Sequence, residues 1–274
     1  MIAAGRLVSV SHLTAIEARP EDFIDHAAAA GFDAVGLRTN PPAHTPDHWP
    51  VTGDLPRARA LRHRADAAGI KVFEAETFSI WPDFSLESLL PGLEVAGILG
   101  AQMLVAAGID ADEARMIDSY GQLADAAAGF GLTIGIEFMP FRPLKSLNDA
   151  ARVQRAVARP NARILIDALH LSRSGSGPEA VAQLDPARIA YLHLCDAEAA
   201  MPADGDFARE ARTARHLPGG GGLPLLELLA AVPPDLPVSV EAPDPNHGAL
   251  PDAEKLRRCA KATRALFARL PELA

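Results

Sequence analysis

The sequence has little cysteine and no long apolar run. Its 274 residues include two cysteines, Cys195 and Cys259, and neither lies in a Cys-x-x-Cys pair, so a disulfide framework is excluded. No uninterrupted apolar stretch reaches the ~18 residues that a membrane-spanning helix requires. The first residues contain no basic stretch followed by a long apolar run, so we expect no secretory signal, no membrane partner and a reducing, cytoplasmic location.

Positive charge and aromatic side chains are also scarce. The formal net charge is −9, and an acidic surface repels a phosphate backbone, so we expect no nucleic-acid partner. Aromatic residues make up 5% of the chain, which leaves few side chains to stack on a sugar ring. The first expected strand is not followed by a Gly-x-Gly-x-x-Gly turn, which argues against a doubly wound dinucleotide-binding sheet.

Hydrophobic residues, by contrast, make up 49% of the chain and are strongly patterned. Short apolar segments alternate with longer segments rich in Ala, Leu, Arg and Glu, as expected for buried parallel strands between helices. We expect strands at residues 6–11, 34–38, 71–77, 103–108, 133–138, 163–168, 189–194 and 237–242. We expect helices at residues 20–31, 55–69, 112–131, 146–158 and 252–270.

Eight strand-and-helix units with no linker between them predict a single (β/α)8 TIM barrel over residues 1–274. Residues 196–222 do not fit this alternation of strands and helices. The segment is too long and too rich in Gly and Pro for a simple strand-to-helix connection. Long loops of this kind are often functional, so we expect a long strand-to-helix loop there. We interpret its glycine run, Gly219–Gly222, as a turn or a lid rather than a phosphate-binding loop.

Ionisable side chains occupy the C-terminal ends of the last four expected strands. The loops at this end of a barrel build its active site, so these side chains should meet at one rim. Three buried carboxylates close together are very unfavourable without a cation. A solvated loop residue or a core histidine would explain any one of the four, but four in succession predict one bound divalent metal ion. The predicted ligands are Glu137, Asp167, His193 and Glu241.

Three oxygen ligands and one nitrogen ligand favour Mn²⁺, with Mg²⁺, Co²⁺ and Zn²⁺ as alternatives. His170 follows Asp167 by one helical turn, and we expect it to contact a substrate oxygen rather than the metal. Three residues at the ends of the early strands are further candidates for substrate contacts, although a loop or salt-bridge role explains each of them equally well. These are His12, Arg38 and Glu76.

The order of motifs in the second half of the chain resembles that of the xylose isomerase-like TIM-barrel superfamily, the sugar phosphate isomerase/epimerase group. The motifs are Ile-Glu at 136–137, Asp-x-x-His at 167–170, His-Leu-Cys-Asp-Ala at 193–197, Arg-His-Leu-Pro-Gly-Gly-Gly at 215–221 and Val-Glu-Ala-Pro at 240–243. The resemblance covers essentially the whole chain. It implies that the four strand-end residues bind one divalent metal and that His170 and Arg215 contact the substrate. Gly220 stands where this family often has Glu.

Two enzymatic hypotheses follow. The first is a metal-dependent sugar or polyol isomerase or epimerase, in which Glu137 and Glu241 serve as acid and base around an enediolate. The second is a dehydratase of a cyclic keto-polyol or hydroxy-acid, with Arg38 and Arg215 available for a carboxylate. The net charge of −9 disfavours a DNA-repair endonuclease of the related barrel type, and the complete ligand set disfavours a non-catalytic barrel. The resemblance is compatible with a homodimer.

Overall fold

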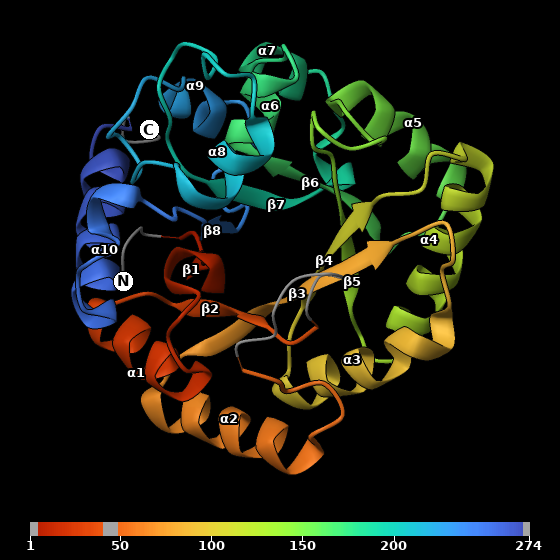
Figure 1. The fold of residues 1–274 in the computed structure, drawn as a ribbon, viewed down its shortest axis with the longest axis horizontal. Coiled ribbons are helices and arrows are strands. Elements are labelled where there is room, and N and C mark those ends of the chain that lie inside the picture. The colour runs from red at the N-terminus through yellow and green to blue at the C-terminus, as the bar shows by residue number, and fades with distance from the viewer. Residues whose placement is uncertain (1–4, 41–48, 271–274) are drawn as a thin grey trace.

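The computed structural model describes residues 5–40 and 49–270, and its strands close into one parallel barrel (Figure 1). Each strand pairs with the next along the chain, and the last strand pairs with the first. The predicted (β/α)8 barrel is therefore confirmed. The predicted span of 1–274 also includes residues 1–4, 41–48 and 271–274, which lie outside the described residues.

The eight strands all overlap the predicted ones. They are β1 (Val8–Val10), β2 (Ala34–Arg38), β3 (Lys71–Ile80), β4 (Met103–Gly108), β5 (Thr133–Glu137), β6 (Ala162–Asp167), β7 (Ile189–Leu194) and β8 (Val238–Val240). The first and last strands are shorter than expected. The third is longer than expected, because it goes on pairing with β4 through Phe78–Ile80.

Helices surround the barrel (Figure 1). The longer ones are α1 (Pro20–Ala30), α2 (Leu55–Ala68), α3 (Leu86–Leu99), α4 (Glu113–Ala128), α5 (Leu147–Val157) and α10 (Asp252–Phe267). Shorter ones are α6 (Ala168–Arg173), α7 (Pro178–Val181), α8 (Phe207–Thr213) and α9 (Leu225–Ala230), with 3₁₀ turns at His12–Ala15, Pro186–Arg188 and Pro245–His247. No helix of residues 5–40 and 49–270 combines the length and apolarity needed to cross a bilayer.

The barrel wall separates two apolar clusters. The larger one joins the outward side chains of the strands to the buried faces of the helices. The buried residues of the smaller one all belong to strands and pack inside the barrel. Within it, Phe73 and Tyr191 pack edge to face with ring centroids 5.1 Å apart. The buried members of this interior cluster are Ala34, Phe73, Val105, Leu165, Ala190 and Tyr191.

A shift in strand register determines which side chains of β3 enter the barrel. Val35 pairs with Val72, but the next residue, Gly36, pairs with Glu74, so that Phe73 is the extra residue. Extra residues of this kind redirect the side chains that follow them. After the shift, the carboxylates of Glu74 and Glu76 are both buried inside the barrel.

The predicted long loop at residues 196–222 contains α8, and hydrogen bonds hold its two ends together. The backbone of Asp196 forms an antiparallel bridge with that of His216, with N···O distances of 2.9 and 2.8 Å. The Asp196 carboxylate also accepts three hydrogen bonds of 2.9 to 3.0 Å from the backbone N–H groups of Ala197, Gly219 and Leu223. These contacts fix the segment against the barrel rim, with the glycine run packed as a turn.

Candidate metal centre

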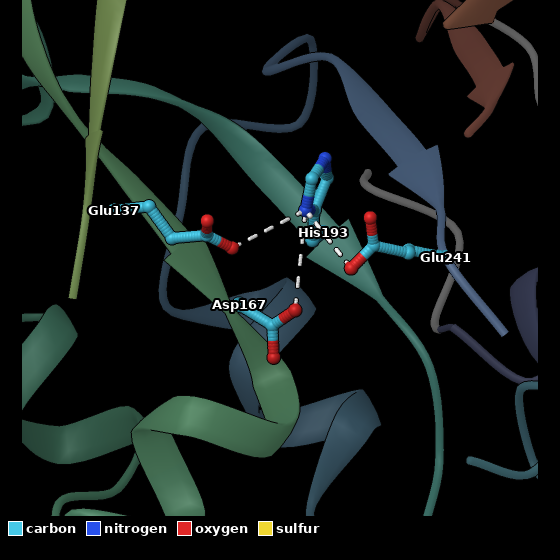
Figure 2. Close-up of side chains that lie close together, drawn as sticks. All are labelled: Glu137, Asp167, His193 and Glu241. Atoms are coloured by element: carbon cyan, nitrogen blue, oxygen red, sulfur yellow. Dashed lines mark ion pairs between the residues drawn. The ribbon is translucent and has the colours of Figure 1, made fainter. Parts of the chain in front are cut away.

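The last four strands bring the four predicted ligands to one point (Figure 2). Asp167 is the register partner of His193 across β6 and β7. The β6 partner of Glu137 lies two residues before Asp167, and Glu241 lies two residues beyond the β8 partner of His193. Steps of two residues keep a side chain on the same face of a strand, so all four side chains point into the barrel.

The spacing of the four side chains fits a bound ion. The Nδ1 atom of His193 lies 3.8 Å from Glu137 Oε1, 3.9 Å from Asp167 Oδ2 and 3.6 Å from Glu241 Oε2. These distances are too long for hydrogen bonds, and they suit atoms that each lie about 2.0–2.2 Å from one shared ion. The buried Nδ1 atom also has no hydrogen-bond partner among the described residues. The four side chains could therefore hold one metal ion.

Hydrogen bonds from residues of other strands orient two of these side chains. Glu74 Oε2 lies 2.9 Å from the Nε2 atom of His193, and the hydroxyl of Ser239 donates a hydrogen bond to the other oxygen of Glu74. The hydroxyl of Ser11 donates to Glu241 Oε1 at 3.0 Å. With its Nε2–H donated to Glu74, His193 directs Nδ1 at the three carboxylates, where this nitrogen would ligate an ion. Glu74 was not among the predicted site residues, although it lies two residues before the predicted Glu76 on the same face of β3.

Arg215 lies directly against the cluster. Its Nη1 atom is 2.5 Å from Asp167 Oδ2, and its Nη2 atom is 2.9 Å from Glu241 Oε2. Its Nε–H donates to the carbonyl oxygen of Ala211 at 2.7 Å, so the last turn of α8 holds the guanidinium in place. Arg215 therefore balances part of the charge of two predicted ligands as well as lining the cavity above them.

The four side chains differ in their tendency to ionise. Burial raises the pKa of Glu137 to about 8, with the charges of Glu241 and Asp167 adding to the effect of burial. Burial would also raise the pKa of Asp167, but Arg215, together with the smaller effects of His170 and His193, outweighs burial and holds the pKa below its ordinary value. Burial would lower the pKa of His193, but the carboxylates of Glu241 and Glu74 raise it well above its ordinary value. For Glu241, the charges of His193 and Arg215 outweigh burial and lower the pKa.

A cavity of about 650 Å³ opens directly above the cluster. Glu137 and Glu241 form part of its lining, whereas Asp167 and His193 do not. His170, a predicted substrate contact, also lines the cavity, and its Nε2 atom lies 4.0 Å from Glu137 Oε1. Burial lowers the pKa of His170 to about 4, so its ring is neutral at pH 7. The cavity therefore exposes two carboxylates and a neutral imidazole to a small molecule.

The early strands contribute two of their three predicted residues to this cavity. Arg38 and Glu76 both line it and form an ion pair at 3.5 Å. His12 lies outside the lining, with its Nε2 atom 3.0 Å from the carbonyl oxygen of Ala18 and its Nδ1 atom accepting from the backbone N–H of Arg38 at 3.3 Å. This geometry suits a residue that supports β2 better than one that contacts substrate, although the predicted role of His12 stays a prediction.

Two further arginines of the cavity were not among the predicted site residues. Arg142 lies in the connection between β5 and α5, and Arg212 lies in α8. Neither follows a strand directly, so the strand-end pattern that found the acidic cluster gave no signal for them. The tertiary structure is what brings both to the cavity, where Phe141 and Trp81 also line the wall.

Comparison with known families agrees with the barrel fold. The sequence profile of the xylose isomerase-like TIM barrel family matches residues 24–263, so the chain belongs to this family. A relative with a curated name, 3-dehydroshikimate dehydratase of Pseudomonas aeruginosa, is 28% identical over 222 residues. The match covers 76% of this chain and 33% of that protein, so the chain spans about a third of the length of this relative.

Solved structures share the fold at low sequence identity. The IOLI protein with a zinc atom has a TM-score of 0.78 and 20% identity, covering 97% of this chain and 99% of that chain. The D-psicose 3-epimerase with D-tagatose from Clostridium cellulolyticum H10 has a TM-score of 0.70 and 16% identity, covering 96% of this chain and 98% of that chain. At these identities the likeness establishes the architecture alone.

Proposed function

We propose that the protein is a divalent-metal-dependent isomerase or epimerase of a small polyhydroxylated carbonyl compound. One observation carries this proposal: three buried carboxylates converge at the floor of a cavity with the Nδ1 atom of His193, which has no hydrogen-bond partner in the described part of the chain. The residues that would hold the ion are Glu137, Asp167, His193 and Glu241. Mn²⁺ suits this set of ligands best, with Mg²⁺, Co²⁺ and Zn²⁺ as alternatives.

The burial of the four side chains divides their tasks. Asp167 and His193 are 0% and 1% exposed and lie below the cavity floor, so their role is to hold the ion. Glu137 and Glu241 are 7% and 6% exposed and reach the cavity from β5 and from the end of β8, on two sides of the cluster (Figure 2). They are therefore placed to exchange protons with a substrate as well.

The two glutamates supply the proton transfers. The bound ion would polarise the substrate carbonyl and so acidify the neighbouring C–H group. One glutamate removes that proton, which yields the enediolate of the substrate, and the other returns a proton from the other side. Return to the same carbon inverts its configuration, and return to the neighbouring carbon exchanges aldose and ketose. His170 and Arg215 line the same cavity and would hold substrate oxygens during the transfer.

A dehydratase is the second candidate, and two observations favour it. The cavity lining includes four arginines, which suit an acidic substrate. The curated relative is named a 3-dehydroshikimate dehydratase. The first proton abstraction would be the same, after which the enediolate expels hydroxide from the next carbon instead of being reprotonated. The product mass separates the two reactions, because dehydration removes one water and isomerisation leaves the mass unchanged.

Metal binding and proton exchange test the proposal directly. Protein stripped with a chelator and reloaded with Mn²⁺ should contain one ion per chain by elemental analysis. With a panel of ketoses, keto-polyols and keto-acids in D₂O, a substrate should incorporate deuterium next to its carbonyl. Glu137→Gln and Glu241→Gln should each reduce this exchange by at least about 100-fold, as expected when a general acid or base is removed. Glu94→Gln, on an exposed face of α3, is the matched control.

Two results would refute this function. One is the absence of stoichiometric metal in the reloaded protein. The other is full exchange activity in both active-site glutamine variants.

A further inference from the structure

Two arginines at the cavity have no acidic partner in the described part of the chain. Arg38 is paired with Glu76 and Arg215 with two carboxylates, but neither Arg142 nor Arg212 forms such an ion pair there. The Nε atom of Arg142 is buried and has no hydrogen-bond partner among the described residues. The side of the cavity formed by these two arginines therefore retains positive charge that no described carboxylate pairs, although the whole chain carries a net charge of −9.

An aromatic ring lies beside both guanidinium groups. The guanidinium carbon of Arg142 is 5.7 Å from the centroid of the Phe141 ring, and that of Arg212 is 6.0 Å from the same ring. Arg142 also lies 6.0 Å from the Trp81 ring. A cation is attracted to the face of an aromatic ring, so these contacts help to hold both guanidinium groups beside Phe141.

Arg142 is half-buried and Arg212 is exposed, so the repulsion between these like charges acts mainly on Arg142 unless an anion lies nearby. Burial lowers the pKa of Arg142, and the charge of Arg212 lowers it further. The buried Nε–H group of Arg142 loses hydration that no described residue replaces. A ligand with negatively charged oxygens would supply the missing acceptors, because the planar guanidinium fork matches carboxylate and phosphate groups in a bidentate manner.

We propose that Arg142 and Arg212 form a subsite for an oxyanion group of the substrate. The substrate is then an acidic polyhydroxylated carbonyl compound, with its reacting carbons over Glu137 and Glu241 and its carboxylate or phosphate group at the two arginines. This inference rests on the proposed function in one respect: the same cavity holds the anionic group and the reacting carbons. The arginines would determine specificity, since they touch neither the predicted metal ligands nor the reacting atoms.

Binding of matched probes tests the subsite without any need for turnover. D-Glucitol, D-gluconate and D-glucitol 6-phosphate have related polyol chains but differ in their charged group. Calorimetric titration of the intact protein, both metal-free and loaded with Mn²⁺, should show at least one anionic probe binding about tenfold or more tightly than D-glucitol. Tighter binding of gluconate identifies a carboxylate subsite, and tighter binding of the phosphate ester identifies a phosphate subsite. An equal increase in affinity for both anionic probes supports a subsite for oxyanions in general.

Substitution assigns the effect to these two side chains. Arg142→Gln with Arg212→Gln should abolish the preference for the anionic probe and leave the affinity for Mn²⁺ unchanged. Arg155→Gln, at an exposed position of α5, removes the same charge elsewhere and should leave the preference intact. An equal affinity of the wild-type protein for all three probes, or a preference that survives in the double variant, would overturn the subsite. Failure of the proposed function would instead show as absent metal or absent deuterium exchange.

Discussion

The Glu74 carboxylate accepts a hydrogen bond from His193 at a distance of 2.9 Å, and this contact fixes which ring nitrogen of His193 faces the acidic cluster. Both residues are almost fully buried, so water cannot replace the contact. A carboxylate behind a metal-binding imidazole fixes the tautomer and raises the basicity of the ligating nitrogen. Glu74 is therefore a positioning residue for the predicted metal centre.

Substitution of Glu74 should weaken metal binding without removing a ligand. We expect Glu74→Gln to reduce the affinity for Mn²⁺ by about 10- to 100-fold, because the neutral amide polarises the imidazole less than the carboxylate does. Competition with a fluorescent chelator measures the affinity, and circular dichroism checks that the fold is retained. Glu94→Gln serves again as the exposed control. Unchanged Mn²⁺ affinity in Glu74→Gln would show that this contact contributes nothing to the centre.

Gly36 provides the space that the two buried glutamates of β3 occupy. A Cβ atom at this position would lie 2.5 Å from Glu74 Oε1 and 2.7 Å from Glu76 Oε1. We expect Gly36→Ala to lower the free energy of unfolding by about 1–3 kcal/mol, the usual cost of overpacking, and to weaken Mn²⁺ binding by displacing Glu74. Denaturant titration and chelator competition measure the two effects.

Gly121 in α4 offers a matched control for this substitution. An added Cβ there meets no atom within 4 Å, so Gly121→Ala should be neutral or should stabilise the helix by about 0.5–1 kcal/mol. If both alanine variants behave alike, crowding around Glu74 and Glu76 is not what restricts position 36.

The stability of the metal-free protein should depend on pH through Glu137. Its pKa is raised from 4.5 to about 8 in the folded chain, so the folded chain holds a proton that the unfolded chain releases between these values. The stability that this carboxyl contributes is present below pH 4.5 and is lost as the pH rises to about 8. The Glu137→Gln variant cannot release a proton at this position. Its free energy of unfolding should therefore rise, relative to that of the wild type, by up to about 1.4 kcal/mol for each pH unit in this window.

Urea titrations at several pH values, with a chelator present, measure this difference between the two metal-free proteins. A difference that is constant from pH 4.5 to 8 would contradict the raised pKa of Glu137. Added Mn²⁺ should reverse the trend for the wild type, because an ion binds the ionised carboxylate and its apparent affinity rises with pH.

The barrel and its acidic rim could be predicted because both depend on short-range patterns. Apolar runs at regular intervals predict the strands, and the rule that active sites form at their C-terminal ends selects residues such as Asp167 and Glu241. Glu74 shares a face of β3 with the predicted Glu76, but its contact with His193 spans the barrel from β3 to β7 and follows only from the closed sheet. Arg142 and Arg212 lie in connecting segments, whose path is set by tertiary contacts such as the buried ion pair of Arg173 with Glu210 in α8.

The position of Arg215 beside two of the three carboxylates lowers the charge that an ion at this centre would have to bring. Its guanidinium compensates one of the three negative charges of the predicted ligands, while the buried Glu74 carboxylate behind His193 adds a further negative charge. A sodium ion would therefore leave a large excess of negative charge, which is costly away from water. The arginine thus sets part of the electrostatic demand on the ion before size or ligand preference comes into play.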